Sequence, residues 1–384
     1  MKKQWFSILG RERALAFAEL AAVLPPDEAP ALEQHGGIAI GTGSGPAWST
    51  IGGSQRAGEV LGTLDELSAP AVIALMQDYL PESGKITLGL SIYGASPKKY
   101  KHTWIDLKNS LRKSGRSARI VTASTGTALN AAQVLHNYLT GGHQSEIVIW
   151  ERGHRWWVGR TTWVQDIDAY THRDRNRPAR DARVGMLPPK LAQIMINLAT
   201  TNRSKLIYDP FCGTGVVLME AGRMGHPVGG IDLSERMVVA TQTNLTWTKQ
   251  DGIDLDTLPV TQQDAQTVEL PSTPLHIVAE GYLGQPFNAV ATRSQIEAEC
   301  ASLNELYTTI LTHFHKQTQI QSIVLALPYW HIQGRDFHLP LLDSIHKIGY
   351  TFDQFAPTSV DWLTYRRTEQ QVGRMIVRLI KKEQ

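Results

Sequence analysis

The sequence predicts an α/β protein in which an α+β half precedes a doubly wound, mostly parallel sheet in the C-terminal part. From about residue 185 onward, helical and strand patterns alternate, which is typical of parallel strands joined by right-handed crossover helices. A glycine-rich loop follows the first strand of this series, and an acidic residue ends the second strand. Together these observations indicate a Rossmann-like fold in the C-terminal part.

The composition is that of a globular protein with more than one domain. The chain has 384 residues, which at about 150 residues per domain suffices for two or three domains. Hydrophobic residues make up 42% of the chain, enough to form large cores and to exclude a mostly disordered protein. The net charge of +2 argues against a nucleic-acid binder that works through its overall charge. We expect domains over residues 1–80, 81–165 and 166–384.

Several classes of protein are disfavoured by features that the sequence lacks. The two cysteines, Cys212 and Cys300, are too few for a disulfide framework or a four-cysteine zinc site, and the histidines show no metal-ligand spacing. No run of about 18 apolar residues predicts a membrane-spanning helix, and the first residues lack the apolar region of a signal peptide. We therefore expect a cytoplasmic protein that binds neither a metal nor a membrane.

In the N-terminal half, short or alternating apolar runs predict strands, and apolar residues at helical spacing predict helices. The expected strands cover residues 5–9, 38–40, 86–93, 118–122, 146–150 and 155–164. The expected helices cover residues 11–24, 100–114 and 128–139. Residues 34–58 are rich in Gly, Ser and Thr, so loops are expected there around one short strand.

The C-terminal elements follow from the same patterns and from helix-start signals. A proline in the first turn marks a helix over residues 188–200, and Ser234 is a plausible cap for a helix over residues 234–249. A third helix is expected over residues 214–224. The strands are expected over residues 206–211, 227–231, 277–279, 322–327, 350–355 and 375–380.

The loop after the first C-terminal strand reads D-P-F-C-G-T-G at residues 209–215. Its glycines allow a tight turn and a close approach to a ligand, and the N-terminus of the next helix can hold a carboxylate. Asp232 ends the next strand, where an acid can accept hydrogen bonds from ribose hydroxyls. Asp264 follows another strand and could bind an adenine amino group. No G-x-x-x-x-G-K-[ST] motif is present, which disfavours a P-loop; the simpler alternative is a strand-to-helix turn with a capping Asp.

The D-P-F-C-G-T-G segment resembles motif I of S-adenosylmethionine-dependent methyltransferases, in the form used by RNA methylases. Residues 173–192 resemble the segment before motif I in archaeal and eukaryotic tRNA guanine-N2 methyltransferases. The N-terminal half is similar to their ferredoxin-like and THUMP domains, through Ser91-Ile92-Tyr93-Gly94 and the lysine-rich helix after it. The resemblance implies a class I methyltransferase domain over residues 166–384, with S-adenosylmethionine as cofactor.

The same resemblance implies which residues hold the cofactor. Asp209, Phe211, Gly213 and Gly215 belong to the loop that would contact its methionine half. Asp232 would bind the ribose and Asp264 the adenine, and Pro188 lies on the segment expected to close over the methionine side.

The expected catalytic motif departs from the family pattern. Amino-group methylases end the fourth strand of the sheet with [ND]-P-P-[YFW], in which an oxygen acceptor aims the amino nitrogen and the aromatic ring stacks on the base. Here Glu280 stands in the acceptor position, both prolines are absent, and Tyr282 or Phe287 supplies the aromatic ring. We expect Glu280 and Tyr282 to act on the substrate; the alternative is a degenerate loop in a protein that binds but does not methylate.

Two basic segments are candidates for contact with nucleic acid. Residues 98–119 carry eight basic side chains against Asp106 alone, and residues 173–190 carry six against two acidic ones. Such segments suit a phosphate backbone. The candidate side chains are Lys98, Lys99, Lys101, Arg112, Lys113, Arg173, Arg175 and Arg177.

The expected function is methyl transfer from S-adenosylmethionine to an exocyclic amino group of RNA, which by the resemblance is N2 of a guanosine in tRNA. Two alternatives stand beside it. One is a DNA methyltransferase acting on N6 of adenine or N4 of cytosine, and the other is an RNA-binding protein that keeps the cofactor fold without turnover.

Overall fold

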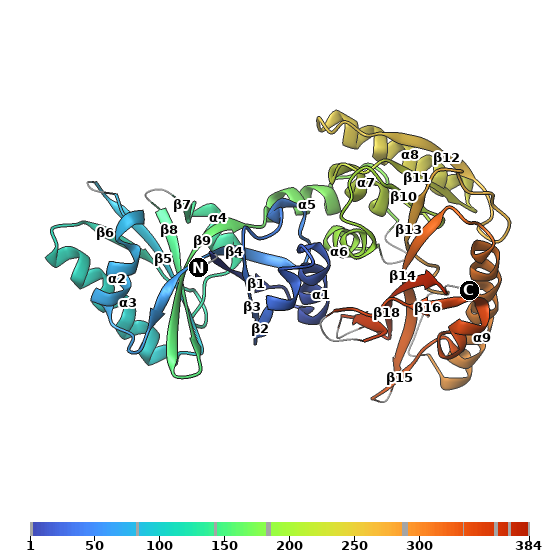
Figure 1. Ribbon diagram of the computed structural model, residues 1–384. Coiled ribbons are helices and arrows are strands. Elements are labelled where there is room, and N and C mark those ends of the chain that lie inside the picture. Colours follow the sequence, from blue (N-terminus) through green and yellow to red (C-terminus); the bar gives the residue numbers. More distant parts are fainter. Residues whose placement is uncertain are drawn as a thin grey trace. The chain divides into compact units, whose positions relative to one another are not determined.

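The computed structural model describes residues 3–81, 84–141, 144–181, 186–285, 291–332, 334–356, 360–367 and 370–382 (Figure 1). The chain forms two compact units. The first unit comprises Met1–Arg13, Leu24–Ser49 and Ser54–Ala169, and the second unit comprises Ala14–Val23, Thr50–Gly53 and Tyr170–Gln384. The second unit thus includes two segments of the expected first domain, and the domains expected over residues 1–80, 81–165 and 166–384 stay predictions.

The first unit is built on one mixed sheet with the strand order β2-β3-β1-β4-β9-β8-β5-β6, and β7 pairs with β8. Strand β5 is parallel to both of its neighbours, and the other pairs are antiparallel. The strands are β1 (Gln4–Leu9), β2 (Glu33–His35), β3 (Ile38–Thr42), β4 (Ser54–Leu64), β5 (Ile86–Tyr93), β6 (Ala118–Val121), β7 (Thr140–Gly141), β8 (Gln144–Arg152) and β9 (Arg155–Val164). The α-helices are α2 (Ala69–Met76), α3 (Pro97–Lys113) and α4 (Ala131–His136), with 3-10 turns at Ala29–Ala31, Trp48–Thr50 and Gln77–Tyr79.

Strand β4 corrects the expectation that residues 34–58 form loops around one short strand. It lies between β1 and β9 and pairs with both. A Cβ at Gly58 would lie 1.9 Å from the backbone oxygen of Arg160 on β9, so the small residue is required for close packing of the two strands. Strand pairing thus overrides the low strand propensity of these small residues.

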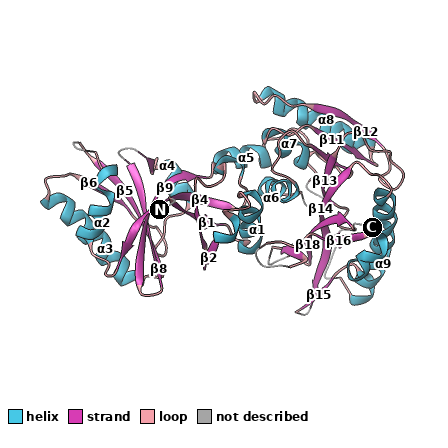
Figure 2. Cartoon of the chain, viewed as in Figure 1, coloured by secondary structure: helices cyan, strands magenta, loops and turns pink. Residues whose placement is uncertain are grey.

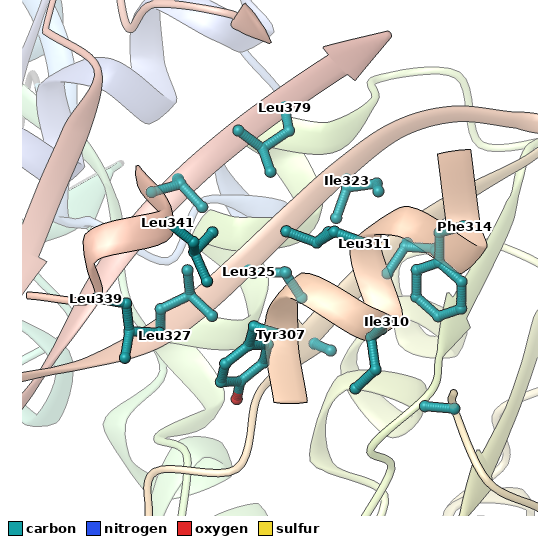
Figure 3. Close-up of a cluster of buried hydrophobic side chains, with 14 of the residues drawn as sticks. Tyr307, Ile310, Leu311, Phe314, Ile323, Leu325, Leu327, Leu339, Leu341 and Leu379 are labelled. Atoms are coloured by element: carbon teal, nitrogen blue, oxygen red, sulfur yellow. The ribbon is translucent and has the colours of Figure 1, made fainter. Parts of the chain in front are cut away.

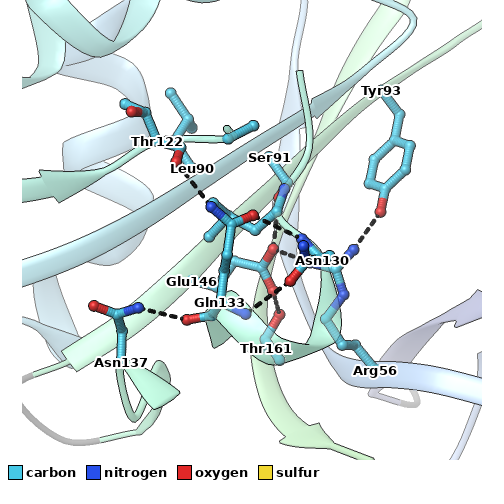
Figure 4. Close-up of polar contacts among 12 residues, drawn as sticks. Arg56, Leu90, Ser91, Tyr93, Thr122, Asn130, Gln133, Asn137, Glu146 and Thr161 are labelled. Carbon is cyan, nitrogen blue, oxygen red and sulfur yellow. Dashed lines mark hydrogen bonds and ion pairs between the residues drawn. The ribbon is translucent and has the colours of Figure 1, made fainter. Parts of the chain in front are cut away.

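A buried polar network ties four strands of the first unit together (Figure 4). The carboxylate of Glu146 accepts hydrogen bonds from Ser91 Oγ and Thr161 Oγ1, both at 2.6 Å, and forms an ion pair with Arg56. Arg56 also donates to Tyr93 Oη at 2.6 Å. Because a buried charge is costly unless it is paired, this network favours the observed register of β4, β5, β8 and β9.

The second unit contains a sheet with the order β12-β11-β10-β13-β14-β18-β16, with β15 paired to β14 and β17 to β18. Strands β10 to β14 are parallel, and β18 lies antiparallel between β14 and β16. The strands are β10 (Leu206–Asp209), β11 (Val228–Asp232), β12 (Thr257–Gln262), β13 (Leu275–Glu280), β14 (Ile320–Ile332), β15 (Arg335–Phe337), β16 (Tyr350–Phe352), β17 (Trp362–Tyr365) and β18 (Val372–Lys381). This is the doubly wound, mostly parallel arrangement that the sequence predicts.

Helices cover both faces of this sheet (Figure 2). They are α1 (Arg13–Val23), α6 (Pro189–Ala199), α7 (Val216–Arg223), α8 (Glu235–Gln250), α9 (Arg293–His315) and a 3-10 segment at Pro340–Ile348, and α5 (Ile167–Arg175) spans the boundary between the units. Alternate strand residues serve two cores: Leu325 packs with α9 and the 3-10 segment, whereas Val324 packs with α1, α6, α7 and α8. Figure 3 shows the α9 core, where Tyr307, Ile310 and Phe314 meet the sheet.

Candidate active site

A cavity of about 470 Å³ lies in the second unit, where the parallel strands β10, β11 and β13 end. Ligands of open α/β sheets bind outside these carboxyl ends, because the loops that follow the strands converge there. The cavity brings together most of the residues predicted for the site. Its lining includes Asp209, Phe211, Gly213, Asp232, Asp264, Glu280 and Tyr282.

The glycine-rich loop connects β10 to α7, which begins at Val216. Gly213 and Gly215 have φ values of 53° and 82°, a region that favours glycine. A Cβ at Gly215 would also lie 2.9 Å from Thr241 Cγ2 on α8, and the Thr241 hydroxyl donates to the Gly213 carbonyl oxygen at 2.8 Å. Gly215 turns the chain into α7 and is not among the residues that line the cavity, so its expected contact with the cofactor stays a prediction.

Asp232, the last residue of β11, holds the glycine-rich loop from the neighbouring strand. Its Oδ2 accepts the Gly213 N–H at 2.9 Å, and its Oδ1 accepts the Ser234 N–H at 2.9 Å. An ionised carboxylate has about four acceptor positions. The two backbone contacts therefore leave acceptor capacity on the side that lines the cavity, as the predicted ribose contact requires.

Five carboxyl groups line the cavity: Asp181, Asp209, Asp232, Asp264 and Glu280. Asp181 forms an ion pair with Arg236, which belongs to the same lining. Asp209 is buried and accepts the Phe211 N–H at 2.9 Å. Burial raises the pKa of Asp209 well above its usual value, and the nearby charges of Asp232 and Glu280 raise it further. Such a lining favours a ligand that carries positive charge.

The cavity also offers apolar surface beside Asp264. Leu233, Met237 and Ala265 belong to the lining there, and Asp264 accepts the Gln266 N–H at 2.9 Å. Apolar walls with a few convergent polar groups are typical of sites for ring-shaped ligands. This corner suits the adenine position that the sequence predicts.

Pro188 caps the N-terminus of α6 and is not among the residues that line the cavity. The two residues before it, Met186 and Leu187, do line the cavity. The backbone N–H of Leu187 also donates to the carboxylate of Glu280. The segment before α6 therefore contributes to the cavity through Met186 and Leu187, and the expected contact of Pro188 with the cofactor stays a prediction.

Glu280, the last residue of β13, forms an ion pair with Arg374 on β18, a partner that sequence reasoning missed. The Glu280 side chain is 20% exposed and that of Arg374 is 6% exposed. Burial raises the pKa of Glu280, and the positive charge of Arg374 opposes this shift. The sequence did offer one sign of this pair, namely an arginine inside an apolar strand pattern. An arginine in such a place is seldom buried without an acidic partner.

The residue after Glu280 explains why the first of the two family prolines is absent. The N–H of Gly281 donates to the Ala326 carbonyl oxygen at 3.1 Å, a hydrogen bond that proline cannot make. A Cβ at Gly281 would lie 2.1 Å from Tyr307 Oη. Tyr282 follows with 38% exposure, so its ring is accessible beside the cavity, whereas Phe287 lies outside the described residues.

The basic segment of the first unit forms the outer face of α3. The inner face packs through Tyr100, Leu107 and Leu111. The five predicted side chains on the outer face are exposed: Lys98, Lys99, Lys101, Arg112 and Lys113. Lys99 Nζ lies 3.9 Å from the centroid of the Trp156 ring, and the arrangement leaves a row of cations on one helix face.

The second basic segment is only partly at the surface, which corrects the expectation for two of its arginines. Arg173 Nε donates to Glu220 Oε1 at 2.7 Å, and Glu220 is fully buried. Arg177 is 2% exposed and lies against Met186. Both side chains therefore hold the chain segment inside the second unit and are not open to phosphate groups, whereas Arg175 is exposed.

Within the described ranges, no helix is long and apolar enough to cross a membrane. Among the same residues, no group of three or more His, Cys, Asp or Glu side chains could hold a metal ion.

Comparisons with known proteins place a methyltransferase domain over this site. A family model of RMKL-like methyltransferase domains matches residues 177–329, which include the glycine-rich loop and the three acids Asp232, Asp264 and Glu280. A second model, of DNA methylases, matches residues 95–243. The predicted cofactor, S-adenosylmethionine, agrees with both matches.

Curated relatives match over short stretches. The chain is 51% identical over 61 residues to a tRNA (guanine(10)-N2)-dimethyltransferase of Methanothermobacter thermautotrophicus, which is 16% of this chain and 18% of that protein. It is 38% identical over 96 residues to the enzyme of the same name from Pyrococcus abyssi, which is 25% of this chain and 28% of that protein. The chain thus spans less than a third of the length of these relatives.

A solved structure matches along the whole chain. TrmN from Thermus thermophilus has a TM-score of 0.54 and 15% sequence identity, with 98% of this chain and 99% of that chain covered. A possible methylase from Clostridium difficile 630 has the same TM-score, with 12% identity, 100% of this chain and 99% of that chain covered. These likenesses confirm the predicted fold class, an α/β chain with a class I, Rossmann-like methyltransferase fold.

Proposed function

We propose that this protein is an S-adenosylmethionine-dependent methyltransferase that acts on an exocyclic amino group of RNA, namely N2 of a guanosine in tRNA. The observation that carries the proposal is the cavity at the carboxyl ends of β10, β11 and β13, whose lining includes Glu280 and Tyr282. The identity to tRNA (guanine(10)-N2)-dimethyltransferases over short stretches supports the choice of substrate.

The cavity suits the cofactor in charge and in shape. S-adenosylmethionine supplies an activated methyl group on a cationic sulfonium, and it also carries an ammonium group. Asp232 and Asp264 provide negative charge for such a ligand, whereas the raised pKa of Asp209 favours its neutral form. In the proposal, Asp232 binds the ribose hydroxyls, Asp264 the adenine amino group, and the loop around Gly213 the methionine half.

Glu280 and Tyr282 hold the substrate base in the proposed reaction. Glu280 accepts a hydrogen bond from the amino group, which aims the nitrogen lone pair at the methyl group. The exposed ring of Tyr282 stacks on a base that has left its helix. The proton that the nitrogen loses passes to the carboxylate or to water, so the contribution of the protein is mainly positioning.

The first unit is proposed to bind the RNA as a THUMP-like domain. The exposed basic face of α3 supports this proposal. Arg175, the exposed candidate of the second basic segment, is proposed to contact RNA as well. Structured RNA is recognised largely by shape and by its phosphates, which suits an exposed basic face. Arg177 is left out of this proposal because it is buried, and Arg173 because its guanidinium is paired with the buried Glu220.

The test is methylation by the purified full-length chain, followed by mass spectrometry of nucleosides. The protein is incubated with labelled S-adenosylmethionine and either tRNA from cells that lack it or duplex DNA. We expect N2-methylguanosine or N2,N2-dimethylguanosine from tRNA only. Cofactor binding in calorimetry without any product would favour the non-catalytic alternative, and Glu280→Ala should reproduce that result while it keeps cofactor affinity.

The match to DNA methylases over residues 95–243 favours a second candidate, methylation of N6 of adenine or N4 of cytosine in DNA. That match ends before Glu280, so it concerns the cofactor loop and not the residues that meet the base. Label in duplex DNA and none in tRNA would establish this candidate instead.

A further inference from the structure

We propose that Tyr138 is a stacking site for an unpaired base of the RNA, and that Arg119 beside it holds a phosphate next to that base. The inference rests on the proposed function, because it deepens the role of the first unit in binding RNA. Tyr138 lies outside both basic segments of the sequence, so the charge pattern does not reveal it.

The backbone of Tyr138 has a conformation that a large side chain disfavours. Its φ is 55°, and among the described residues it is the only one other than glycine with a positive φ. In this left-handed region the Cβ clashes with the backbone of the same residue, so glycine or asparagine is the usual choice where a helix ends in this way. A tyrosine at this position therefore carries a cost to folding.

The turn after α4 fixes this conformation without the ring of Tyr138. The Tyr138 N–H donates to the Leu135 carbonyl oxygen at 3.0 Å, and the Leu139 N–H donates to the Val134 carbonyl oxygen at 3.0 Å. This pair of hydrogen bonds is the usual pattern in which a left-handed residue ends a helix. Leu139 is fully buried in a cluster with Leu129 and Val134, and β7 begins directly after it. The buried neighbours therefore determine the turn.

The ring of Tyr138 lies at the surface. The residue is 76% exposed, the largest fraction among the exposed large hydrophobic residues of the described ranges. Within those ranges its side chain forms no hydrogen bond and no ring contact with another residue. Backbone strain of this kind is found mostly at functional positions. Since no packing of the ring compensates for the strain, the combination points to a ligand of the ring.

The side chains beside Tyr138 suit a nucleotide. Arg119 is exposed on β6, an edge strand of the first sheet, and its Nη2 donates to Asn137 Oδ1 at 3.4 Å. Asn137 is held on α4, because its Nδ2 donates to the Gln133 carbonyl oxygen at 2.8 Å (Figure 4). A guanidinium has five N–H donors, so one long hydrogen bond leaves donors for a phosphate. The cation is thus placed next to the residue that precedes Tyr138.

An exposed aromatic ring beside a cation is the arrangement with which proteins bind unpaired nucleotides, through stacking of the base and contact with the phosphate. A base inside a helix has both faces covered by its neighbours, whereas bases in loops, bulges and ends of a folded RNA offer a free face. The ligand of Tyr138 is therefore an unpaired base. This contact adds to those of the basic face of α3, which suits phosphates.

Substitution of Tyr138 separates the ring from the fold, because asparagine accepts the left-handed conformation better than tyrosine. In Tyr138→Asn the urea midpoint of the full chain should equal or exceed that of the wild type. The Kd for tRNA should rise by about fivefold to a hundredfold, as expected for the loss of one stacked base. Tyr138→Phe keeps the ring and should bind like the wild type. A lower urea midpoint or an unchanged Kd in Tyr138→Asn would overturn the inference.

The dependence on salt distinguishes stacking from charge. Stacking releases no counterions, so the slope of log Kd against log salt should be unchanged in Tyr138→Asn. In Arg119→Gln the slope should decrease by about 0.7, the value for one phosphate of a single strand. Val239→Asn, at an exposed apolar position of α8 in the second unit, is the matched control and should bind tRNA like the wild type. An unchanged slope in Arg119→Gln would contradict the proposed phosphate contact.

Fluorescence tests whether a base stacks on the ring. In tRNA transcripts, 2-aminopurine replaces one unpaired base at a time, and stacking quenches its fluorescence. At one position at least, the wild type and Tyr138→Phe should quench the fluorescence, whereas Tyr138→Asn should not. A fully paired RNA duplex, which offers no free base, should bind the wild type and Tyr138→Asn equally. Equal quenching by Tyr138→Asn and the wild type at every position would contradict the inference.

The outcomes distinguish this inference from the function on which it rests. Tyr138 does not line the cavity, so Tyr138→Asn should raise KM for tRNA and leave kcat unchanged. An absence of methylated guanosine in every RNA, with tRNA still bound through Tyr138, would overturn only the proposed reaction. Methylated guanosine together with wild-type tRNA affinity in Tyr138→Asn would overturn only the role of Tyr138.

Discussion

The hydroxyl of Tyr307 occupies the space beside Gly281 in which a side chain would lie. A Cβ at Gly281 would come within 2.1 Å of Tyr307 Oη, and the same hydroxyl donates to the Tyr282 carbonyl oxygen at 2.8 Å. Tyr307 is itself fully buried in the core below α9 (Figure 3). Through Tyr307, helix α9 thus fixes the position of the backbone at Gly281 and Tyr282, the latter being the residue that would stack on the base.

Gly281→Ala should destabilise the protein by about 1–3 kcal/mol, because the new methyl group must displace the Tyr307 hydroxyl from a packed core. Methyl transfer should fall as well, since the same shift moves Tyr282. Urea denaturation and kcat/KM measure the two effects. Gly141→Ala is the control, because a Cβ at Gly141 would meet nothing within 4 Å. Tyr307→Phe removes the hydroxyl and so relieves part of the clash. The double variant Gly281→Ala with Tyr307→Phe should therefore lose less stability than the sum of the losses in the two single variants.

Asp232→Ala should weaken binding of S-adenosylmethionine by about tenfold to a hundredfold, or about 1.4–2.8 kcal/mol. The variant loses the proposed ribose contact and the hydrogen bonds that Asp232 accepts from Gly213 and Ser234. Isothermal calorimetry gives the affinity. Asp254→Asn, an exposed acid of the same unit, should bind like the parent. Unchanged affinity of Asp232→Ala would show that the cofactor site has been assigned wrongly.

Neutralising the outer face of α3 should weaken RNA binding without affecting the cofactor. In the triple variant Lys98→Gln, Lys101→Gln and Lys108→Gln, the slope of log Kd against log salt should decrease by about two, as expected when about three phosphate contacts are lost. Fluorescence anisotropy with labelled tRNA measures the slope. A control triple changes three exposed lysines of the second unit to Gln: Lys249, Lys316 and Lys347. Equal slopes for both triples would contradict a specific role of α3.

Acid should destabilise the second unit through two buried histidines. Burial lowers the pKa values of His226 and His276 to about 4. His226 is neutral here, because its Nε2 accepts from Arg203 at 2.9 Å and its Nδ1 donates to the Lys205 carbonyl oxygen at 3.0 Å. The unfolded chain binds these protons near pH 6.5, so stability is complete above that pH and is lost as the pH falls towards 4.

The expected loss is of the order of 3 kcal/mol for each histidine. Urea denaturation between pH 4.5 and 7.5, a range set by these shifts, measures it. His226→Gln should flatten the dependence of the free energy of unfolding on pH, whereas His154→Gln, at an exposed position, should not. A curve of unchanged slope in His226→Gln would exclude the proposed cause.

Much of the fold could be predicted because local patterns coincide with the elements. Strands β5 and β9 have the predicted bounds, since both are rich in strand-forming residues and adjoin a turn: β5 ends before Gly94, and β9 begins after the turn at Gly153. Helix α4 is shorter than the expected 128–139, because Asn130 and Gln133 form a capping box that starts it late. That signal was present in the sequence and could have been used.

Only those parts of the site that lie within one continuous segment of the sequence could be predicted. The glycine-rich loop, Asp232 and Asp264 follow strands in a fixed pattern, and the structure places their side chains or backbone around one cavity. The pair of Glu280 and Arg374 depends on which strands become neighbours, and β18 enters the sheet between β14 and β16, out of chain order. The pairing of Arg173 with Glu220 and the burial of Arg177 beside Met186 likewise depend on tertiary contacts, which net charge does not indicate.

Helix α1 belongs to the second unit although the chain on both sides of it belongs to the first. Leu15 and Ala18 pack in the same core as α6, and the buried Glu19 accepts a hydrogen bond from Asn197 of α6 at 2.7 Å. During synthesis this helix leaves the ribosome long before α6 is made. Its apolar face therefore stays without its packing partner until α6 has been synthesised. Expression of residues 166–384 alone would therefore yield a unit with an exposed apolar groove and unsatisfied polar groups, in place of an independent enzyme.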